Sequence, residues 1–257
     1  MPTLRPFARA RREDPRQARF LTLASLRWVI RHRAWSRWYL VRYWRFLWFK
    51  LRNPHVVTEG FVFLGRHVEL HARRGYGRLV LGRWVHVGDE NRLRAHEGTL
   101  RVGDKCVFGR DNTVNCYLDV EFGAATIVAD WVYVCDFDHV FSDIHVPIKD
   151  QGIVKSPVRI GPDVWVGTKV TVLRGTTVGH GTVLAAHAVV TGDVPPMSVA
   201  VGAPARVVRD RVADYEAAAA HRMALEDMAR KAAESAIAVQ RTTPAAAPGH
   251  APAEPHR

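Results

Sequence analysis

The sequence has few cysteines and no long apolar run, and both scarcities limit the kinds of protein it can encode. Its three cysteines, Cys106, Cys116 and Cys135, are too few and too scattered for a disulfide framework, and no Cys-x-x-Cys pair suggests zinc. No run of about 18 uncharged apolar residues occurs, so we expect no spanning helix. Arginine interrupts every apolar stretch near the N-terminus, which argues against a signal peptide. A reduced, cytoplasmic protein fits these features.

Acidic residues are scarce at the N-terminus. Residues 1–54 contain fourteen Lys or Arg but only two acids, Glu13 and Asp14, whereas the remainder holds 23 of each sign. The formal net charge of +12 therefore belongs to an N-terminal arm. The same arm carries five of the eight tryptophans, and residues 20–51 lack Pro and Gly, which predicts one helix ended by Asn53-Pro54.

A helix rich in Trp and Arg has more than one use. It suits an anionic membrane surface, where indole rings bury and guanidinium groups meet lipid phosphates. The alternative is that the aromatic residues pack on the body of the protein or on a neighbouring subunit. Nucleic-acid binding is a third and less favoured reading, because basic and aromatic residues also make that surface.

A six-residue repeat dominates the middle of the chain. An aliphatic residue recurs at every sixth position in the series Ile160, Val166, Val172, Val178, Leu184, Val190. The same step occurs upstream within four groups: Thr58, Leu64, Leu70; Leu81, Val87, Leu93; Val102, Phe108, Val114; and Phe122, Val128, Val134. Extra residues separate one group of three from the next. Internal repeats of this kind indicate a solenoid.

Three hexapeptides make one triangular coil, so the repeat predicts an all-β parallel β-helix of about six coils. The aliphatic residues point inward, and the extra residues enter at a single corner, with a long inserted loop after Val134. The expected division is a basic aromatic helical arm at 1–55, the β-helix at 56–210, a C-terminal helix at 211–240 and a disordered tail at 241–257.

The last repeats carry a family resemblance. The motifs Val164-Trp165-Val166-Gly167-Thr168, Leu173-Arg174-Gly175-Thr176-Thr177-Val178-Gly179, Val190-Thr191-Gly192-Asp193-Val194-Pro195-Pro196 and Gly202-Ala203-Pro204-Ala205-Arg206-Val207-Val208-Arg209 follow one another. The series resembles the hexapeptide-repeat acetyltransferases, particularly the sugar O-acetyltransferase branch with galactoside, maltose and nodulation-type enzymes. That resemblance spans about 58–210 and implies a left-handed β-helix, a homotrimer with active sites between subunits, and acetyl-CoA as donor.

The long insertion, residues 135–152, contains the candidate base. Relatives bear their catalytic histidine on an extended loop at this position, and by that match the base is His139. Imidazole titrates near working pH, so it can take the proton of a hydroxyl that attacks a thioester. If donor and acceptor meet directly, no Ser or Cys nucleophile is needed. His145 is the rival candidate, and an ordinary loop histidine is the plain alternative.

The acceptor site is less well defined by the sequence. Asp136, Asp138 and Asp143 are candidates to orient the imidazole or to contact the acceptor, and each is equally well read as a solvated side chain. Sugar-acetylating relatives have Asn at the position of Gly109 and Asp at that of Tyr117. The nearby Asn112 and Asn115 are candidates to substitute, so galactoside or maltose specificity does not transfer.

The resemblance also implies a donor site along the last coils. Trp165 matches a tryptophan that walls the site, and Gly167, Thr168 and Ala186 lie at positions that meet the pantetheine arm. Arg206 and Arg209 match basic residues near the nucleotide phosphates, although both also read as a solvated tail. Gly192 stands where some relatives have Lys.

The expected function is therefore acyl-CoA-dependent O-acylation of a sugar-containing acceptor, such as a cell-envelope glycolipid or polysaccharide intermediate at the cytoplasmic membrane face. A non-catalytic scaffold or partner-binding module is the alternative. A γ-type carbonic anhydrase would share the fold and requires three zinc-binding histidines, but His139, His145, His180 and His187 lack the expected spacing, so we expect no metal.

Overall fold

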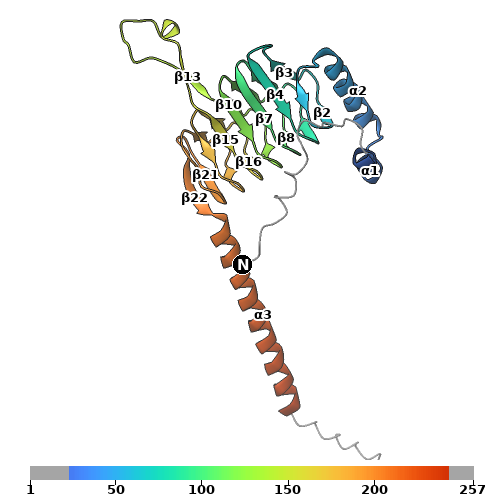
Figure 1. The fold of residues 1–257 in the computed structure, drawn as a ribbon. Coiled ribbons are helices and arrows are strands. Elements are labelled where there is room, and N and C mark those ends of the chain that lie inside the picture. The colour runs from blue at the N-terminus through green and yellow to red at the C-terminus, as the bar shows by residue number, and fades with distance from the viewer. Residues whose placement is uncertain (1–22, 243–257) are drawn as a thin grey trace, which may run out of the picture. The chain divides into compact units, whose positions relative to one another are not determined.

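The computed structural model describes residues 23–242, and the chain divides into two compact units between Arg211 and Val212 (Figure 1). The first unit contains a solenoid of three parallel sheets, which we call A, B and C. Sheet A consists of β1 (Val57–Thr58), β4 (Gly77–Leu81), β7 (Gly98–Val102), β10 (Asp119–Phe122), β15 (Val158–Ile160) and β18 (Thr177–Val178).

The other two sheets alternate with sheet A along the chain. Sheet B consists of β2 (Val62–Leu64), β5 (Val85–Val87), β8 (Val107–Phe108), β11 (Ile127–Val128), β16 (Trp165–Val166), β19 (Val183–Leu184), β21 (Ser198–Val201) and the antiparallel β22 (Arg206–Asp210). Sheet C consists of β3 (Glu69–Ala72), β6 (Arg92–Ala95), β9 (Thr113–Cys116), β12 (Tyr133–Cys135), β17 (Thr171–Val172) and β20 (Val189–Val190). Each A–B–C set is one coil, which confirms the predicted parallel β-helix of six coils.

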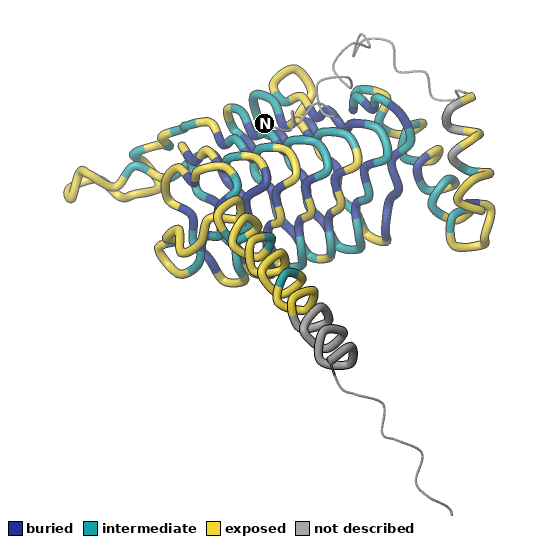
Figure 2. Tube along the Cα trace, turned by 90° about the horizontal axis from the view of Figure 1, so that it is seen from below, coloured by how far each residue is buried: buried dark blue, intermediate teal, exposed yellow. Residues whose placement is uncertain are grey.

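The strand register confirms the inward residues of the repeat. Thr58, Leu81, Val102, Phe122, Ile160 and Val178 pair in succession along sheet A. The corresponding residues of sheets B and C, from Leu64 to Leu184 and from Leu70 to Val190, stack in the same way. All are buried, and the buried positions run as continuous rows through the coils (Figure 2). Neighbouring coils therefore share one core.

Two corners of each coil are tight, and the third is open in the first four coils. At the corner between sheets B and C, a Cβ on Gly88 would lie 2.0 Å from the carbonyl oxygen of Gly109 in the next coil, so no side chain fits there. The corner between sheets C and A accepts the extra residues, as predicted. Its largest insertion contains the hairpin of β13 (Phe137–His139) and β14 (Ile153–Lys155).

The N-terminal arm differs from the single helix that was predicted. It contains α1 (Leu23–Arg31) and α2 (Arg37–Arg52), because the chain turns at residues 32–36, where Arg33 has a φ of 47°. Asn53 caps α2 as expected through its N–H to the carbonyl of Phe49. Tyr43 of α2 packs on Phe61 and Phe63 of the first coil, with ring centroids 5.3 and 5.8 Å apart. The predicted start of the helix at Phe20 lies outside the described residues.

The second unit begins at Val212, and its described part is helical: α3 (Arg211–Thr242) agrees with the C-terminal helix predicted at 211–240. Residues 243–257 of the predicted disordered tail lie outside the described residues. No described helix combines the length and the apolar character needed to cross a bilayer.

Candidate active site

His139 lies at the end of β13, at the open corner that follows β12. Its backbone pairs with Ile153 of β14, and its side chain is exposed. Beyond it, residues 140–152 form a loop that projects from the coils (Figure 1). Gln151 holds this loop together, because its side chain accepts the N–H of Asp143 and donates to the carbonyls of Asp143 and Val146. A short 3-10 helix, Ile148–Asp150, precedes Gln151.

The imidazole of His139 has one aromatic ring beside it. The ring of Phe137 meets it edge-on, with centroids 6.3 Å apart at 78°. Among residues with described side chains, none forms a hydrogen bond with the His139 ring. His145 is exposed in the projecting loop, where its N–H donates to Asp143.

Asp138 is paired with Arg174, a residue for which no role was predicted. Nε of Arg174 lies 2.5 Å from Oδ2 of Asp138, and Nη1 of Arg174 lies 3.5 Å from Oγ of Ser156. Arg174 follows β17 of the next coil, so the pair ties the His139 hairpin to the solenoid. Arg174 belongs to one of the motifs that carry the family resemblance, but its partner Asp138 lies 36 residues away in the sequence.

Asp136 has a structural position that does not fit acceptor binding. It is fully buried; its Oδ1 accepts the N–H of Tyr117 at 2.8 Å, and its Oδ2 accepts those of Leu118 and Asp119 at 2.7 and 2.8 Å. The carboxylate thus accepts the backbone N–H groups of the turn in the preceding coil. Asp136 was predicted as a candidate acceptor contact, but this carboxylate is buried and its oxygens already accept three N–H groups.

Asn112 is likewise buried in the core and not on a reachable surface. Its Oδ1 accepts the N–H of Val132 at 2.7 Å, and its own N–H donates to Asn91 of the preceding coil at 3.2 Å. Asn91 and Asn112 therefore form a ladder inside a tight corner, which corrects the expectation that Asn112 meets the acceptor. Asn115 is half-buried beside Tyr133. Burial raises the pKa of Tyr133, and a hydrogen bond with Asn115 offsets part of that rise.

Aromatic rings form a row along the open corner. The rings of His96 and Tyr117 stack at 4.8 Å and 22°, and Tyr117 meets Phe137 at 4.6 Å and 61°. Nζ of Lys155 lies 2.5 Å from Glu97 and 5.9 Å from the Tyr117 ring centroid. The row leads from the second coil to His139. Of its members only Tyr117 and His139 were predicted.

The cysteines of this corner are poor nucleophiles. Burial, followed by the nearby Asp136, raises the pKa of Cys116 to about 12. Burial also raises the pKa of Cys135. Both thiols stay protonated at neutral pH, and a protonated thiol does not attack a thioester.

The candidate donor residues gather on sheet B near the end of the solenoid. Register aligns Trp165 with Val183, then Val199, then Arg209, so the four residues form one row across β16, β19, β21 and β22. The Trp165 side chain is half exposed, and Arg206 and Arg209 are exposed. A cavity of about 240 Å³ adjoins Arg206 and is also lined by Gly192 and Asp193.

The remaining donor candidates meet at the tight corner after sheet B. A Cβ on Gly167 would lie 2.7 Å from the backbone nitrogen of Ala186, and His187 donates its N–H to the carbonyl of Thr168 at 2.9 Å. Gly167, Thr168 and Ala186 are thus brought together, with Ala186 exposed and Thr168 half-buried. Gly192 has open space where a Cβ would stand, so a Lys would fit at this position.

The base and the donor face lie on different sides of one chain. His139 leaves the corner between sheets C and A, whereas Trp165 and Arg209 lie on sheet B. In a three-sided coil that corner stands opposite sheet B. The described residues contain no group of three or more His, Cys, Asp or Glu that could hold a metal ion.

Three comparisons agree with this architecture. The family description "Bacterial transferase hexapeptide (six repeats)" matches residues 157–192. The probable acetyltransferase Rv3034c of Mycobacterium tuberculosis is 60% identical over 236 residues, which cover 90% of this chain and 79% of that protein. The putative lipopolysaccharide biosynthesis O-acetyl transferase WbbJ of Escherichia coli is 34% identical over 121 residues, covering 42% of this chain and 62% of its own length.

Among solved structures, a mutant of the Bacillus cereus N-acyltransferase AntD, in complex with dTDP-4-amino-4,6-dideoxyglucose and coenzyme A, matches with a TM-score of 0.52. It is 15% identical, and the match covers 65% of this chain and 92% of that one, so the likeness is one of fold. The long match to Rv3034c establishes the family. The chain belongs to the hexapeptide-repeat acetyltransferases.

Proposed function

We propose that the chain transfers an acetyl group from acetyl-CoA to a hydroxyl of a sugar-containing acceptor, with His139 as the general base. The observation that carries the proposal is an exposed imidazole at the end of the inserted hairpin, in a chain 60% identical to a probable acetyltransferase. A glycolipid or polysaccharide intermediate of the cell envelope is the preferred acceptor, and WbbJ, named for lipopolysaccharide O-acetylation, motivates that choice.

The proposed reaction is a direct transfer. The acceptor oxygen attacks the thioester carbonyl while Nε2 or Nδ1 of His139 takes the hydroxyl proton. The tetrahedral intermediate then collapses, the C–S bond breaks, and the imidazolium returns the proton to the coenzyme A thiolate. Protonated Cys116 and Cys135 support a path without a covalent cysteine intermediate.

The proposed site lies between subunits of a homotrimer. Two observations support this arrangement: His139 stands opposite the Trp165 row of its own chain, and its ring has no polar partner among the side chains described in that chain. A neighbouring copy would bring its donor face to the His139 corner. Trp165, Gly167, Thr168 and Ala186 would line the pantetheine arm, and Arg206 and Arg209 would pair with phosphates.

The aromatic row is the proposed acceptor surface. Sugar rings bind flat aromatic faces, and Tyr117 lies between His96 and Phe137 on the same corner as His139. Glu97 and Lys155 add a carboxylate and an ammonium group that can bind hydroxyls. Asn115 and Asp138 are the remaining predicted contacts near this row.

Thioester turnover tests the base. With acetyl-CoA and a panel of sugar-containing acceptors, replacing His139 by Ala should lower turnover at least about 10²-fold while leaving the melting temperature unchanged. The matched control is His145→Ala in the same exposed loop, which should keep wild-type turnover. Unchanged turnover in the His139→Ala variant, or an equal loss in the control, would remove His139 from the mechanism. Mass spectrometry of the product would identify the acceptor.

Mixed oligomers test the site between subunits. Chains carrying His139→Ala and chains carrying Trp165→Ala are each expected to be impaired alone. Co-expressed, they should recover part of the activity, because some sites would pair an intact His139 with an intact Trp165. The control places both changes on one chain and mixes it with the inactive His139→Ala chain, which should recover nothing. No recovery in the first mixture would place the site within one chain.

A further inference from the structure

The N-terminal helices present two faces with different chemistry. Tyr39, Tyr43 and Phe46 of α2 point to the first coil, where Phe46 is fully buried. On a different face of the same helix, Leu40, Trp44, Leu47 and Leu51 follow a helical spacing and are between 43% and 68% exposed. We call these four residues the outer stripe. Packing on the solenoid thus accounts for the inner face only.

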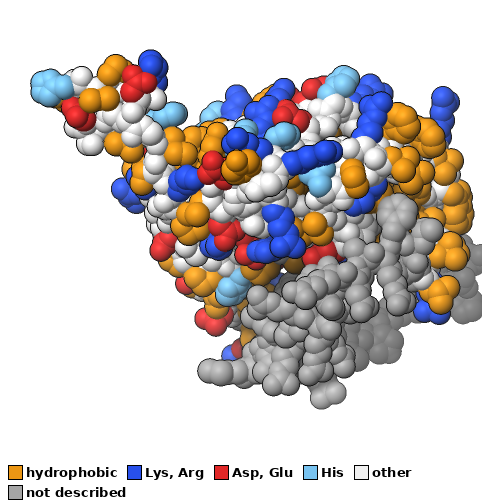
Figure 3. All heavy atoms as spheres, turned by 45° about the horizontal axis from the view of Figure 1, so that its top comes forward, with side chains coloured by type: hydrophobic (Ala, Val, Ile, Leu, Met, Phe, Trp, Pro, Cys, Tyr) orange, Lys and Arg blue, Asp and Glu red, His pale blue; other side chains and the backbone are white. Residues whose placement is uncertain are grey.

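The outer stripe continues into neighbouring apolar side chains. Trp44 stacks on Trp48 with ring centroids 6.4 Å apart at 14°, and Val41 is exposed beside them. Leu23, Leu26 and Ile30 of α1 are also more than half exposed. In Figure 3, hydrophobic side chains gather at the end of the molecule formed by α1 and α2. An apolar surface of this extent, rimmed by charge, is typical of a binding surface.

The charge around this surface has one sign. Residues 15–58 contain no acid, and α1 and α2 alone carry Arg27, Arg31, Arg37, Arg42, Arg45, Lys50 and Arg52. The guanidinium of Arg42 lies 3.4 Å from the Trp38 ring centroid, and that of Arg52 lies 4.4 Å from the Trp48 ring centroid. A second copy would bring the same positive charge to this surface, whereas an anionic surface would neutralise it.

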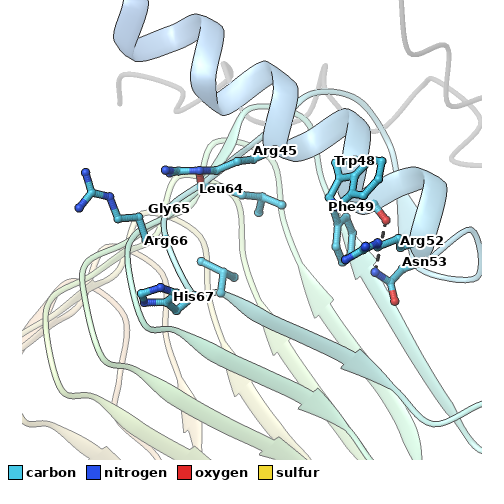
Figure 4. Close-up of a pocket in the computed structure, with 10 residues that line it drawn as sticks. Arg45, Trp48, Phe49, Arg52, Asn53, Leu64, Gly65, Arg66 and His67 are labelled. Atoms are coloured by element: carbon cyan, nitrogen blue, oxygen red, sulfur yellow. Dashed lines mark hydrogen bonds between the residues drawn. The ribbon is translucent and has the colours of Figure 1, made fainter.

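Two grooves run between α2 and the turn that follows β2. One, of about 680 Å³, is lined by Arg45, Trp48, Arg52, Arg66 and His67 among others; Arg45, Arg66 and His67 flank one end of it and Trp48 and Arg52 the other (Figure 4). The second, of about 520 Å³, is lined by Arg37, Arg42, Arg45 and Arg66, with Asp89 as its one acid. The grooves share Arg45 and Arg66, and their guanidinium groups suit phosphate oxygens.

We propose that α1 and α2 dock the protein on an anionic lipid bilayer. The leucines of the outer stripe lie at the level of the acyl-chain boundary, Trp44 and Trp48 lie among the headgroups, and the arginine-lined grooves hold lipid phosphates. This binding is peripheral. It is independent of the proposed acyl transfer, because none of the residues that carry it belongs to the His139 corner or to the Trp165 row.

Vesicle sedimentation with the purified full-length chain tests the proposal. We expect binding to vesicles of phosphatidylcholine mixed with phosphatidylglycerol at about 0.01 M salt, and much weaker binding to phosphatidylcholine alone or at about 1 M salt, where charges are screened within about 3 Å. Equal binding to both kinds of vesicle, binding to neither, or displacement by free glycerol phosphate would overturn the proposal.

Two pairs of variants assign the binding to this surface. Trp44→Ser with Leu47→Ser should weaken vesicle affinity at least about tenfold, because the variant loses two apolar side chains that the bilayer would bury. The control Trp131→Ser removes a similarly exposed tryptophan from the solenoid and should leave affinity unchanged. Arg37→Gln with Arg52→Gln should weaken affinity about 30-fold at low salt and little at high salt. Its control, Arg74→Gln with Arg78→Gln, neutralises two exposed arginines of the solenoid.

Oligomeric mass separates a lipid partner from a protein partner. Light scattering should give the same mass for the wild type and the Trp44→Ser, Leu47→Ser variant, and turnover of a water-soluble acceptor should also be the same. A fall in mass would show that the outer stripe joins copies of the chain, which would overturn the proposal. Loss of vesicle affinity in the control variants would overturn it as well.

Discussion

The tight and open corners of the solenoid differ in the side chains that they carry. At the corner after sheet B, residues such as Gly88 and Gly167 are small because the next coil passes within contact distance. At the corner after sheet C, the chain carries His96, Tyr117 and the His139 hairpin. Here the buried carboxylate of Asp136 adds hydrogen bonds to three backbone N–H groups of the preceding coil. The regular corners make the scaffold, and the irregular corner is free to carry chemistry.

The sharpest test of this difference removes the carboxylate that holds the open corner. Asp136→Ala would leave the N–H groups of Tyr117, Leu118 and Asp119 without their partner. Because each buried unsatisfied donor costs about 1–3 kcal/mol, we expect the free energy of unfolding to fall by at least about 3 kcal/mol. Denaturant titration measures it. Asp143→Ala, in the exposed loop, should change stability by less than about 0.5 kcal/mol. A small effect at Asp136 would mean that water replaces the carboxylate.

A tight corner should fail for a steric reason. In Gly88→Ala the new Cβ would lie 2.0 Å from the carbonyl oxygen of Gly109, so the coils must separate, and we expect a loss of about 1–3 kcal/mol. Gly192→Ala is the control, because no atom lies within 4 Å of the position of its Cβ. Thermal unfolding compares the two variants. Equal melting temperatures would show that the corner adjusts without strain.

A smaller effect is expected at the pair that ties the hairpin to the next coil. Arg174→Gln removes the contact with Asp138, and we expect kcat to fall about fivefold with KM for acetyl-CoA unchanged, because the hairpin carrying His139 is less well positioned. Both side chains are partly exposed, so stability should change by less than about 1 kcal/mol. A control, Arg101→Gln, breaks a comparable surface pair with Glu121 away from the hairpin and should leave kcat unchanged. Equal kcat values in both variants would contradict a positioning role.

The smallest expected effect concerns pH and the packing of α2. Burial, followed by the charge of Arg42, lowers the pKa of His86, whose ring lies 4.3 Å from that of Phe63. As the pH falls below the ordinary histidine value of about 6.5, the unfolded chain takes up a proton that the folded chain resists, so stability decreases. Melting temperatures between about pH 7.5 and pH 5 should fall less steeply in His86→Phe. Equal slopes would show that His86 does not contribute.

The sequence predicted the solenoid because its core repeats at a fixed period. Every inward residue from Thr58 to Val190 has the predicted neighbour in the next coil. The corner of the insertions was also predicted, because the repeat breaks only there.

The contacts within the open corner could not be predicted. Asp136 meets Tyr117 and Asp138 meets Arg174 across neighbouring coils, and the insertions of unequal length hide which residues become neighbours. From the sequence, Asp136 was a candidate to orient the imidazole or to contact the acceptor, whereas in the structure its buried carboxylate accepts three backbone N–H groups. The turn at residues 32–36 was missed because no Pro or Gly marks it. The assignments of His139 and of the donor residues remain predictions.

The last strand has a consequence for how the protein behaves in concentrated solution. A stack of parallel strands ends in a row of unpaired backbone groups, to which another chain could add its own strand. In sheet B the chain reverses, and β22 pairs antiparallel with β21, so that Arg206, Arg209 and Asp210 lie on the outermost strand. Charges on that strand oppose the addition of another copy, so that growth of fibres from this end is discouraged by the protein's own terminal turn.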